Sequence, residues 1–515
     1  MSLPLIVIIE LGSQYTLLIE RICRELGVRA IILNPERASA WFKSHPVNAV
    51  ILSGGSASVY DAGAPQPPEE VLSLKRLDGS PAPVLGICYG MQWMAKHLGG
   101  TVRASPDHRE YGETKISVLS GDDPLFGGTS LEQIVWMSHG DSVVAVPAGF
   151  SVLAKTQNGA IAAMGNGTSA WGVQFHPEVP HTAEGKKIFA NFLYTIAGCE
   201  RDWKPTAIIA AIGDRIRTGL KGDDAKAIIG FSGGVDSTTI AKIASGVLGE
   251  RLLALTIDGG QLREGEIDEI RRHAACAGVS PKIIDACEEF AAALAGVTDA
   301  EEKRKRFRGG YVRLFLRAAR EFGAAAVIQG TLAPDRIESG DTGGAVIKTH
   351  HNVGLDMGDL TQLHPVDHLF KYEIRAVAQD IGLPESVWRR QPFPGPGLFL
   401  RVVGTPATPK TLNIVRWADA RVREILVQHG LYGGVSQLVV ALLGIKTVGV
   451  KGDGRVYGWS IAVRAVETVD FMTARCVHFP DPVEDEITKA ITAHPDIVRA
   501  IFDFTQKPPA TTEFE

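Results

Sequence analysis

"FSGGVDSTT", residues 231–239, joins an apolar run to a helix-like segment and places two glycines, two serines and an aspartate at the junction. The apolar run is Ala227 to Phe231, and the segment that follows, "TTIAKIASGVLG", has helical spacing. A helix start presents unpaired N–H groups and a partial positive charge, and glycines allow an anion to approach closely. The stretch therefore predicts a strand–turn–helix unit with a phosphate site. An ordinary capped turn, with Ser237 as the cap, is the alternative that stays open.

Composition limits the classes of protein that fit. The chain has 515 residues, 45% of them hydrophobic and 22% charged, which is typical of a soluble globular protein with several domains. The net charge of -5, without a long basic stretch, argues against nucleic acid as the main partner. The N-terminal run "LPLIVIIE" is too short to span a bilayer and has no basic leader, so no membrane association is expected.

The six cysteines are far apart and form no CxxC pair, which speaks against a zinc ribbon or a disulfide framework. Thiols that stay reduced fit a reducing compartment, so we expect a cytoplasmic protein.

The first third of the chain alternates short β-rich runs with helical segments, including "AVILSGG", "PVLGICYGMQWMAKHLGG" and "AWGVQFHPE". This alternation predicts an open, largely parallel sheet with helices on both faces. Ligands of such sheets bind at the carboxyl ends of the strands. Functional residues should therefore follow the strands directly.

A thiol and an imidazole occupy such positions. Cys88 stands between Gly86 and Gly90 in "GICYG", the thiol counterpart of the turn that exposes a nucleophilic serine. A thiol needs activation, which a helix start and a nearby histidine supply. His176 follows another strand, and Glu178 stands two residues further on, where it can orient the imidazole as the acid of a triad does. A purely structural histidine is the alternative for His176 taken alone.

These motifs, over about residues 5–199, resemble the class I glutamine amidotransferases. The resemblance implies that Cys88 is the nucleophile, His176 the acid/base and Glu178 the orienting acid. Glutamine would lose ammonia and form a glutamyl thioester with Cys88, which water would then hydrolyse. It also implies two backbone oxyanion donors, one near Gly55 in "SGGS" and one at the N–H of Tyr89.

"FSGGVDST" is similar to the pyrophosphatase loop of the N-type ATP pyrophosphatases, which cleave ATP between its α and β phosphates. A Walker A motif, G-x-x-x-x-G-K-[ST], does not occur in the sequence. A carboxylate beside phosphates requires a bridging cation, so Mg²⁺ is expected at Asp236. The resemblance implies that ATP is bound by Ser232, Gly233, Gly234, Val235, Asp236, Ser237 and Thr238.

Two later loops, 256–266 and 327–339, also follow apolar runs. In a doubly wound sheet they would lie where adenine, ribose and the reacting group bind. Simple polar loops remain the alternative for each.

The sequence changes character after "RRQPFPGPGLFLRVVG", residues 389–404. Residues 411–426 form an amphipathic helical pattern, and residues 446–467 read as two strands around a Gly-Asp-Gly turn. We therefore expect a compact α+β domain. Exposed sheet edges in a small terminal domain invite pairing with another copy, so a homodimer is predicted.

The order of these three regions, together with the ending "KPPATTEFE", resembles the glutamine-hydrolysing GMP synthetase family over essentially the whole chain. The resemblance implies a class I glutamine amidotransferase domain at 1–199, an ATP pyrophosphatase domain at 200–390 and a dimerisation and acceptor domain at 391–515. The implied reaction aminates xanthosine 5'-monophosphate (XMP) to GMP through adenylyl-XMP. The small-molecule substrates would be glutamine, ATP and XMP, with AMP and pyrophosphate released.

The resemblance also implies XMP contacts in the terminal segment, with Lys507 directed toward phosphate and Glu513 toward the base. The basic run "EEKRKRFR", residues 301–308, lies inside the nucleotide region, and we hypothesise that Arg304 clamps a phosphate of the acceptor. A solvated helix face and a disordered tail are the alternatives. Other functions to be tested are a different ATP-pyrophosphatase amidotransferase and a catalytically silent nucleotide-binding scaffold.

Overall fold

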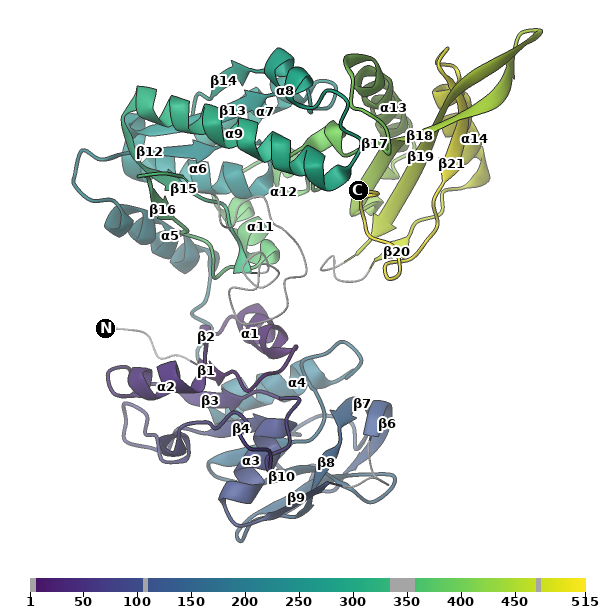
Figure 1. Ribbon diagram of the computed structural model, residues 1–515. Coiled ribbons are helices and arrows are strands. Elements are labelled where there is room, and N and C mark those ends of the chain that lie inside the picture. Colours follow the sequence, from purple (N-terminus) through teal and green to yellow (C-terminus); the bar gives the residue numbers. More distant parts are fainter. Residues whose placement is uncertain (1–5, 105–109, 334–356, 469–473) are drawn as a thin grey trace. The chain divides into compact units, whose positions relative to one another are not determined.

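The computed structural model describes residues 6–104, 110–333, 357–468 and 474–515 (Figure 1). The chain divides into two compact units, Met1–Ala207 and Ile208–Glu515. The division into three domains that the sequence suggests stays a prediction.

The first unit is built on one mixed sheet of nine strands. Five strands are parallel, and four more continue the sheet in antiparallel pairing. The sequence predicted a largely parallel sheet, but short links at 157–160 and 166–169 can join only antiparallel neighbours. The order is β2 (Ala30–Leu33), β1 (Ile6–Ile9), β3 (Ala49–Leu52), β4 (Val84–Ile87), β11 (Ala170–Val173), β10 (Ile161–Gly165), β9 (Ser151–Thr156), β6 (Glu110–Val118) and β7 (Glu132–His139).

Helices cover both faces of this sheet, as the alternating pattern predicted. Along β1, Ile6 and Ile8 enter one hydrophobic cluster and Val7 and Ile9 enter another, as the two-residue period of a strand requires. The first cluster is covered by α1 (Thr16–Glu25) and α4 (Gly185–Ala190), the second by α2 (Pro35–Phe42) and α3 (Tyr89–His97). A separate pair of strands, β5 (Thr101–Ala104) and β8 (Asp141–Ala145), completes the unit.

The second unit contains a five-stranded sheet that is parallel throughout. Its order is β14 (Lys282–Asp285), β13 (Leu252–Asp258), β12 (Lys226–Gly230), β15 (Ala324–Ile328) and β16 (Thr361–Leu363). In the described residues, the α-helices of this part are α5 (Pro205–Gly219), α6 (Val235–Leu248), α7 (Glu266–Ala277), α8 (Cys287–Ala293), α9 (Ala300–Phe322), α11 (Lys371–Asp380) and α12 (Glu385–Trp388). The predicted strand–turn–helix around 231–239 is the β12–α6 connection.

A second sheet of the same unit pairs β17 (Val402–Val403), β18 (Gln437–Lys451), β19 (Gly454–Glu467), β20 (Arg475–Cys476) and β21 (Ile497–Phe502). Helices α13 (Pro409–Gln428) and α14 (Asp481–Thr492) pack on it. The predicted hairpin is present, because β18 and β19 pair antiparallel as far as Lys451 and Gly454, and its tip projects from the sheet in Figure 1. One continuous core joins this sheet to the parallel one.

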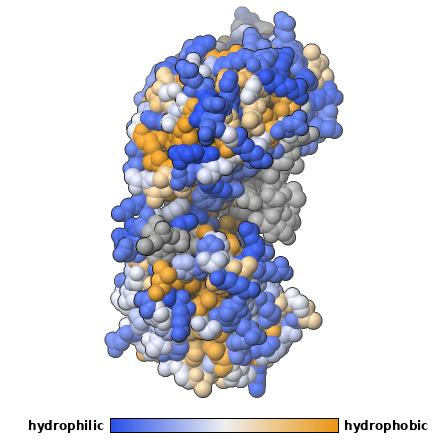
Figure 2. Space-filling model, turned by 90° about the vertical axis from the view of Figure 1, so that its left-hand side faces the viewer, coloured by the Kyte–Doolittle hydropathy of each residue, from blue (hydrophilic) through white to orange (hydrophobic). Residues whose placement is uncertain are grey.

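Among the described residues, no helix is both long and apolar enough to cross a membrane. Hydrophilic and apolar residues intermingle on the face seen in Figure 2. All six cysteines carry free thiols.

Candidate active site

Cys88 lies in a strained turn between β4 and α3. Its φ is +49°, and it is the one non-glycine residue with positive φ in the described parts of the chain. Two glycines make this turn possible. A Cβ on Gly86 would lie 2.7 Å from the backbone of Gly90, and a Cβ on Gly90 would lie 2.6 Å from the carbonyl oxygen of Leu52. The turn therefore has the geometry of a nucleophile elbow.

His176 follows β11, the strand next to β4, and is 4% exposed. Its Nδ1 lies 2.7 Å from Oε1 of Glu178. Burial alone would lower the pKa of His176, but the Glu178 carboxylate and a hydrogen bond with Cys88 raise that pKa to about 10. The imidazole is therefore protonated at neutral pH, where it can stabilise a thiolate and later donate a proton.

A third strand end completes the thiol site. Gly54 follows β3, and a Cβ at this position would lie 2.9 Å from Cε1 of His176 and 3.6 Å from Cβ of Cys88. The predicted Gly55 is the next residue, where a Cβ would lie too close to the carbonyl oxygen of Leu11. Tyr89 is the first residue of α3, so its N–H has no acceptor within the helix. Sequence reasoning missed Gly54, although it stands in the same "SGGS" loop.

In the second unit, a cavity of about 540 Å³ opens beyond the carboxyl end of β12. This volume is in the usual range of small-molecule sites. Two predicted loop residues do not line it: Gly233 turns the chain with φ +68°, and Thr238 is wholly buried. The other two predicted loops contribute Gln261 and Gln329 among others. The 232–238 residues that do line the cavity are Ser232, Gly234, Val235, Asp236 and Ser237.

Distant side chains hold this loop in place. Oγ of Ser237 accepts a hydrogen bond from the backbone N–H of Ser232 at 3.3 Å. Nδ1 of His273 lies 2.7 Å from the carbonyl oxygen of Gly233. Arg390 donates to the carbonyl oxygen of Ser232 at 2.7 Å and forms an ion pair with Glu266. Sequence reasoning missed His273 and Arg390 because no local pattern connects them to the loop.

Asp236 is held by a cation from another helix. Its Oδ2 pairs with Nζ of Lys371, the first residue of α11, whereas its Oδ1 is buried without a hydrogen-bond partner among the described residues. Lys371, Arg390 and Arg308 all line the cavity. Three cations around a loop at a helix start suit a polyphosphate.

The described residues contain no cluster of three or more His, Cys, Asp or Glu side chains suited to a metal ion. A cation at Asp236 would therefore need further oxygen ligands from a substrate. Mg²⁺ is commonly bound in this way, through one or two carboxylates and the phosphates of the nucleotide.

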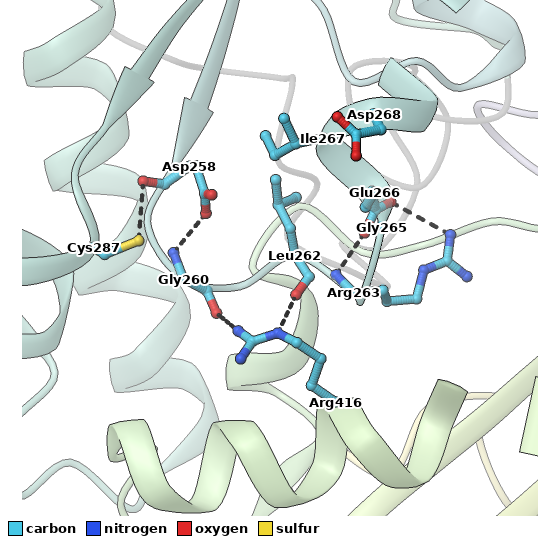
Figure 3. Close-up of a pocket in the computed structure, with 10 residues that line it drawn as sticks. All are labelled: Asp258, Gly260, Leu262, Arg263, Gly265, Glu266, Ile267, Asp268, Cys287 and Arg416. Atoms are coloured by element: carbon cyan, nitrogen blue, oxygen red, sulfur yellow. Dashed lines mark hydrogen bonds and ion pairs between the residues drawn. The ribbon is translucent and has the colours of Figure 1, made fainter. Parts of the chain in front are cut away.

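A smaller cavity of about 330 Å³ lies beside the 256–266 loop (Figure 3). Arg416, from α13, donates to the carbonyl oxygens of Gly260 at 2.7 Å and Leu262 at 2.9 Å. Burial, assisted by the carboxylates of Asp285 and Asp258, raises the pKa of the Cys287 thiol to about 12, so this thiol stays protonated. This region therefore fixes the loop to α13 and offers no activated nucleophile.

The predicted acceptor contacts occupy ordered positions. Oε1 of Glu513 accepts hydrogen bonds from Gln437 at 2.7 Å and from Arg401 at 3.1 Å. The backbone of Lys507 pairs with Ala474 in both directions, at 2.9 and 3.0 Å, so the tail is tied down. Arg304 pairs with Glu301 at 3.3 Å and lines neither cavity, whereas Arg308 lines the larger one.

Three family models match the chain in succession. The model for class-I glutamine amidotransferases matches residues 7–196, the model for NAD synthase matches residues 208–395, and the model for the GMP synthase C-terminal domain matches residues 424–514. The fold is thus a class I amidotransferase domain followed by an ATP pyrophosphatase domain and a GMP synthase C-terminal domain.

Curated relatives match over their whole length. GMP synthase [glutamine-hydrolyzing] from Thermobifida fusca is 44% identical, covering 99% of this chain and 98% of the relative. The proteins of the same description from Pyrobaculum aerophilum and Streptomyces coelicolor are 43% and 42% identical, with coverage of 99% of this chain and of 99% and 98% of the relatives. The chain belongs to the family of glutamine-hydrolysing GMP synthases.

Proposed function

We infer that this protein is a ligase that aminates XMP to GMP with nitrogen from glutamine, while ATP is cleaved to AMP and pyrophosphate. The observation that carries this inference is the presence of two distinct chemical settings in one chain. One is a buried thiol with a charged imidazole, and the other is a cation-lined cavity at a phosphate loop. Neither setting alone would couple the hydrolysis of glutamine to the ATP-dependent amination of an acceptor.

The thiol site releases ammonia. The sulfur of Cys88 attacks the carboxamide carbon of glutamine, and the backbone N–H groups near Gly54–Gly55 and at Tyr89 stabilise the oxyanion. His176 gives its proton to the departing nitrogen, and a glutamyl thioester remains on Cys88. A water molecule then attacks the thioester, loses a proton to His176 and releases glutamate. Glu178 keeps the imidazole oriented and charged through its 2.7 Å contact.

The cavity of the second unit prepares the acceptor. The oxygen at C2 of XMP attacks the α-phosphorus of ATP, and pyrophosphate leaves into the 232–237 loop, where Lys371 and Arg390 offset its charge. Ammonia then attacks C2, and AMP leaves with the former C2 oxygen. This oxygen is a poor leaving group until it is part of a phosphate ester.

We propose Mg²⁺ as the cation that accompanies ATP. The protein ligand that fits it is Oδ1 of Asp236, which has no partner among the described residues and lies in a cavity otherwise rich in cations. Bound there, Mg²⁺ would neutralise charge that builds up on the leaving pyrophosphate. A binding measurement tests this without turnover. Addition of Mg²⁺ should strengthen the binding of ATP to the wild type but not to Asp236→Asn.

We propose that XMP is held by the C-terminal tail. Glu513 has lone pairs left after its contacts with Arg401 and Gln437, so it can accept further hydrogen bonds from the base. Lys507 would contact the phosphate, and Arg304 on α9 is the proposed second phosphate contact.

One experiment tests the function directly. The protein is incubated with glutamine, MgATP and one acceptor at a time, and the nucleotides are separated. XMP should give GMP and AMP, whereas IMP and nicotinic acid adenine dinucleotide should give no aminated product. Amination of nicotinic acid adenine dinucleotide would favour another amidotransferase of the ATP-pyrophosphatase group. Absence of turnover with all three acceptors would favour a nucleotide-binding scaffold.

We also propose that the β18–β19 hairpin mediates a homodimer. Val448 pairs with Tyr457 across the hairpin, and Val450 lies on the same face. These side chains are 40%, 64% and 76% exposed, which is unusual for an apolar set at an unpaired sheet face. Val450→Glu should convert a dimer to a monomer in sedimentation velocity. Val427→Glu, which changes the same residue type at a position on α13 that is 60% exposed, should leave the dimer intact.

The cytoplasm is the proposed location. Six unpaired thiols, one of them the nucleophile, fit a reducing compartment. Fluorescent fusions that concentrate at the cell envelope would contradict this proposal.

A further inference from the structure

The second unit contains a lysine that the reaction described above does not use. Lys303 belongs to the basic run 301–308, yet its side chain is 0% exposed. A buried lysine is rare unless it is paired, because removal of an ammonium group from water is unfavourable unless a partner compensates for it. Nζ of Lys303 donates to the carbonyl oxygen of Val402 and to Oε2 of Glu515 at 3.2 Å.

The partner is the last residue of the sequence. Glu515 is 11% exposed, and its Oε1 accepts a hydrogen bond from the backbone N–H of Gly404 at 2.7 Å. Terminal residues are usually poorly ordered unless specific contacts hold them. One oxygen of this carboxylate thus accepts from the buried Lys303 and the other from the backbone of Gly404. Figure 1 shows the C-terminus beside β17 and the start of α9.

The same short segment, residues 401–404, forms a second ion pair with the tail. Arg401 is 1% exposed and binds Glu513 through Nε at 3.4 Å and Nη2 at 3.1 Å. Arg401 is itself fixed by Asp419 at 3.1 Å. Glu513 and Glu515 thus attach to opposite ends of one segment, and Lys303 supplies the buried charge at the second attachment.

We propose that Lys303 and Glu515 form a latch that positions the C-terminal tail, and with it Glu513, for the acceptor nucleotide. The latch also ties the tail to α9, which carries the proposed phosphate contact Arg304 next to Lys303. This inference rests on the proposed role of the tail in binding XMP. Lys303 and Glu515 are positioning residues and need not touch the substrate.

Kinetics of Glu515→Gln test the latch, because this substitution keeps the shape and removes the charge. Loss of the charged partner of a buried ammonium should raise KM for XMP about tenfold, because a buried donor left without its charged acceptor destabilises the attached tail. kcat, KM for ATP and the hydrolysis of glutamine by itself should stay within about twofold of wild type. Glu302→Gln is the matched control, because it breaks the half-exposed pair with Arg306 on the same helix.

Carboxypeptidase provides a readout without catalysis. It should release the terminal residues of Glu515→Gln and of Lys303→Met about ten times faster than those of wild type or Glu302→Gln, since cleavage follows the population of the open tail. Melting curves confirm that each variant is folded. The double variant should release its residues no faster than Lys303→Met alone, because both changes break one interaction.

These experiments distinguish failure of the proposed Lys303–Glu515 latch from failure of the proposed reaction. Equal KM for XMP and equal protection in wild type and Glu515→Gln would overturn the latch. A parallel rise of KM for ATP would also overturn it, because it would indicate a general loss of structure. If wild type does not convert XMP, the proposed function fails, and the carboxypeptidase comparison still decides whether Lys303 holds the tail.

Discussion

The thiol site and the nucleotide cavity differ in how complete they are without ligands. Cys88, His176 and Glu178 are 3–4% exposed, and His176 already interacts with each of the other two. In the cavity, Lys371 pairs with one oxygen of Asp236, whereas the second oxygen of Asp236 has no partner among the described residues. The first site is preorganised around its nucleophile, whereas the second needs its substrates to complete it.

The largest effect should come from removal of the nucleophile. Cys88→Ala should reduce glutamine-dependent GMP formation about 10³-fold or more, because no other group can form the thioester. GMP formation from ammonium chloride should stay within about twofold of wild type, since the cavity does not depend on the thiol. Parallel assays with the two nitrogen sources measure both rates. An equal loss with ammonium would mean that the sites are not separable.

Asp236→Asn should give the opposite pattern with a smaller effect. It removes the proposed Mg²⁺ ligand and the partner of Lys371, so GMP formation should fall about 10²-fold with either nitrogen source. Hydrolysis of glutamine measured without nucleotides should not change. Asp214→Asn is the control, because this carboxylate lies on the surface in a 2.5 Å pair with Arg217. A loss restricted to glutamine as the nitrogen source would contradict the assignment.

Glu178→Gln tests why the thiol site is preorganised. The pKa of His176 is raised to about 10. The charged imidazole therefore stabilises the folded protein fully below pH 6.5, and this stabilisation is lost as the pH rises through about 10. Without the Glu178 charge, this pKa should fall, and the alkaline limb of glutaminase activity should move to lower pH. At pH 8 we expect a loss of about tenfold. An unchanged alkaline limb would show that Glu178 does not set the charge of His176.

The smallest effect concerns the packing around the imidazole. Gly54→Ala would place a Cβ 2.9 Å from Cε1 of His176, so the buried ring must shift. We expect a loss of about fivefold in glutaminase kcat/KM, because small displacements of an acid/base group are costly. Gly127→Ala, where the nearest atom would be 3.5 Å away, is the control. Equal rates for both variants would remove Gly54 from the site.

Much of the thiol site was predictable because its signals are local. Cys88 sits between two glycines that the turn requires, and Glu178 is two residues from His176. Both groups follow short apolar runs, and a parallel pairing of β4 with β11 is sufficient to bring them together. The antiparallel half of that sheet was not distinguished, since a short apolar run looks the same in either pairing.

Other residues escaped prediction because their partners are remote in sequence. Lys371 reaches Asp236 across 135 positions, and Arg390 reaches Ser232 across 158. The charge pattern of α9 did not show which of its cations is buried. The run 301–308 favoured a solvated helix face, with a phosphate contact at Arg304 as the hypothesis that stays a prediction, and the structure buries Lys303 and places Arg308 at the cavity. Only tertiary packing decides which of several adjacent cations is buried.

An isotope experiment tests the central claim that one site liberates ammonia while the other activates XMP through ATP. XMP labelled with ¹⁸O at C2 is converted with glutamine and MgATP, and the products are analysed by mass spectrometry. Attack of the C2 oxygen on the α-phosphorus predicts one ¹⁸O in the phosphoryl group of AMP for each GMP formed. Label found in orthophosphate together with ADP, or AMP free of label, would contradict the account.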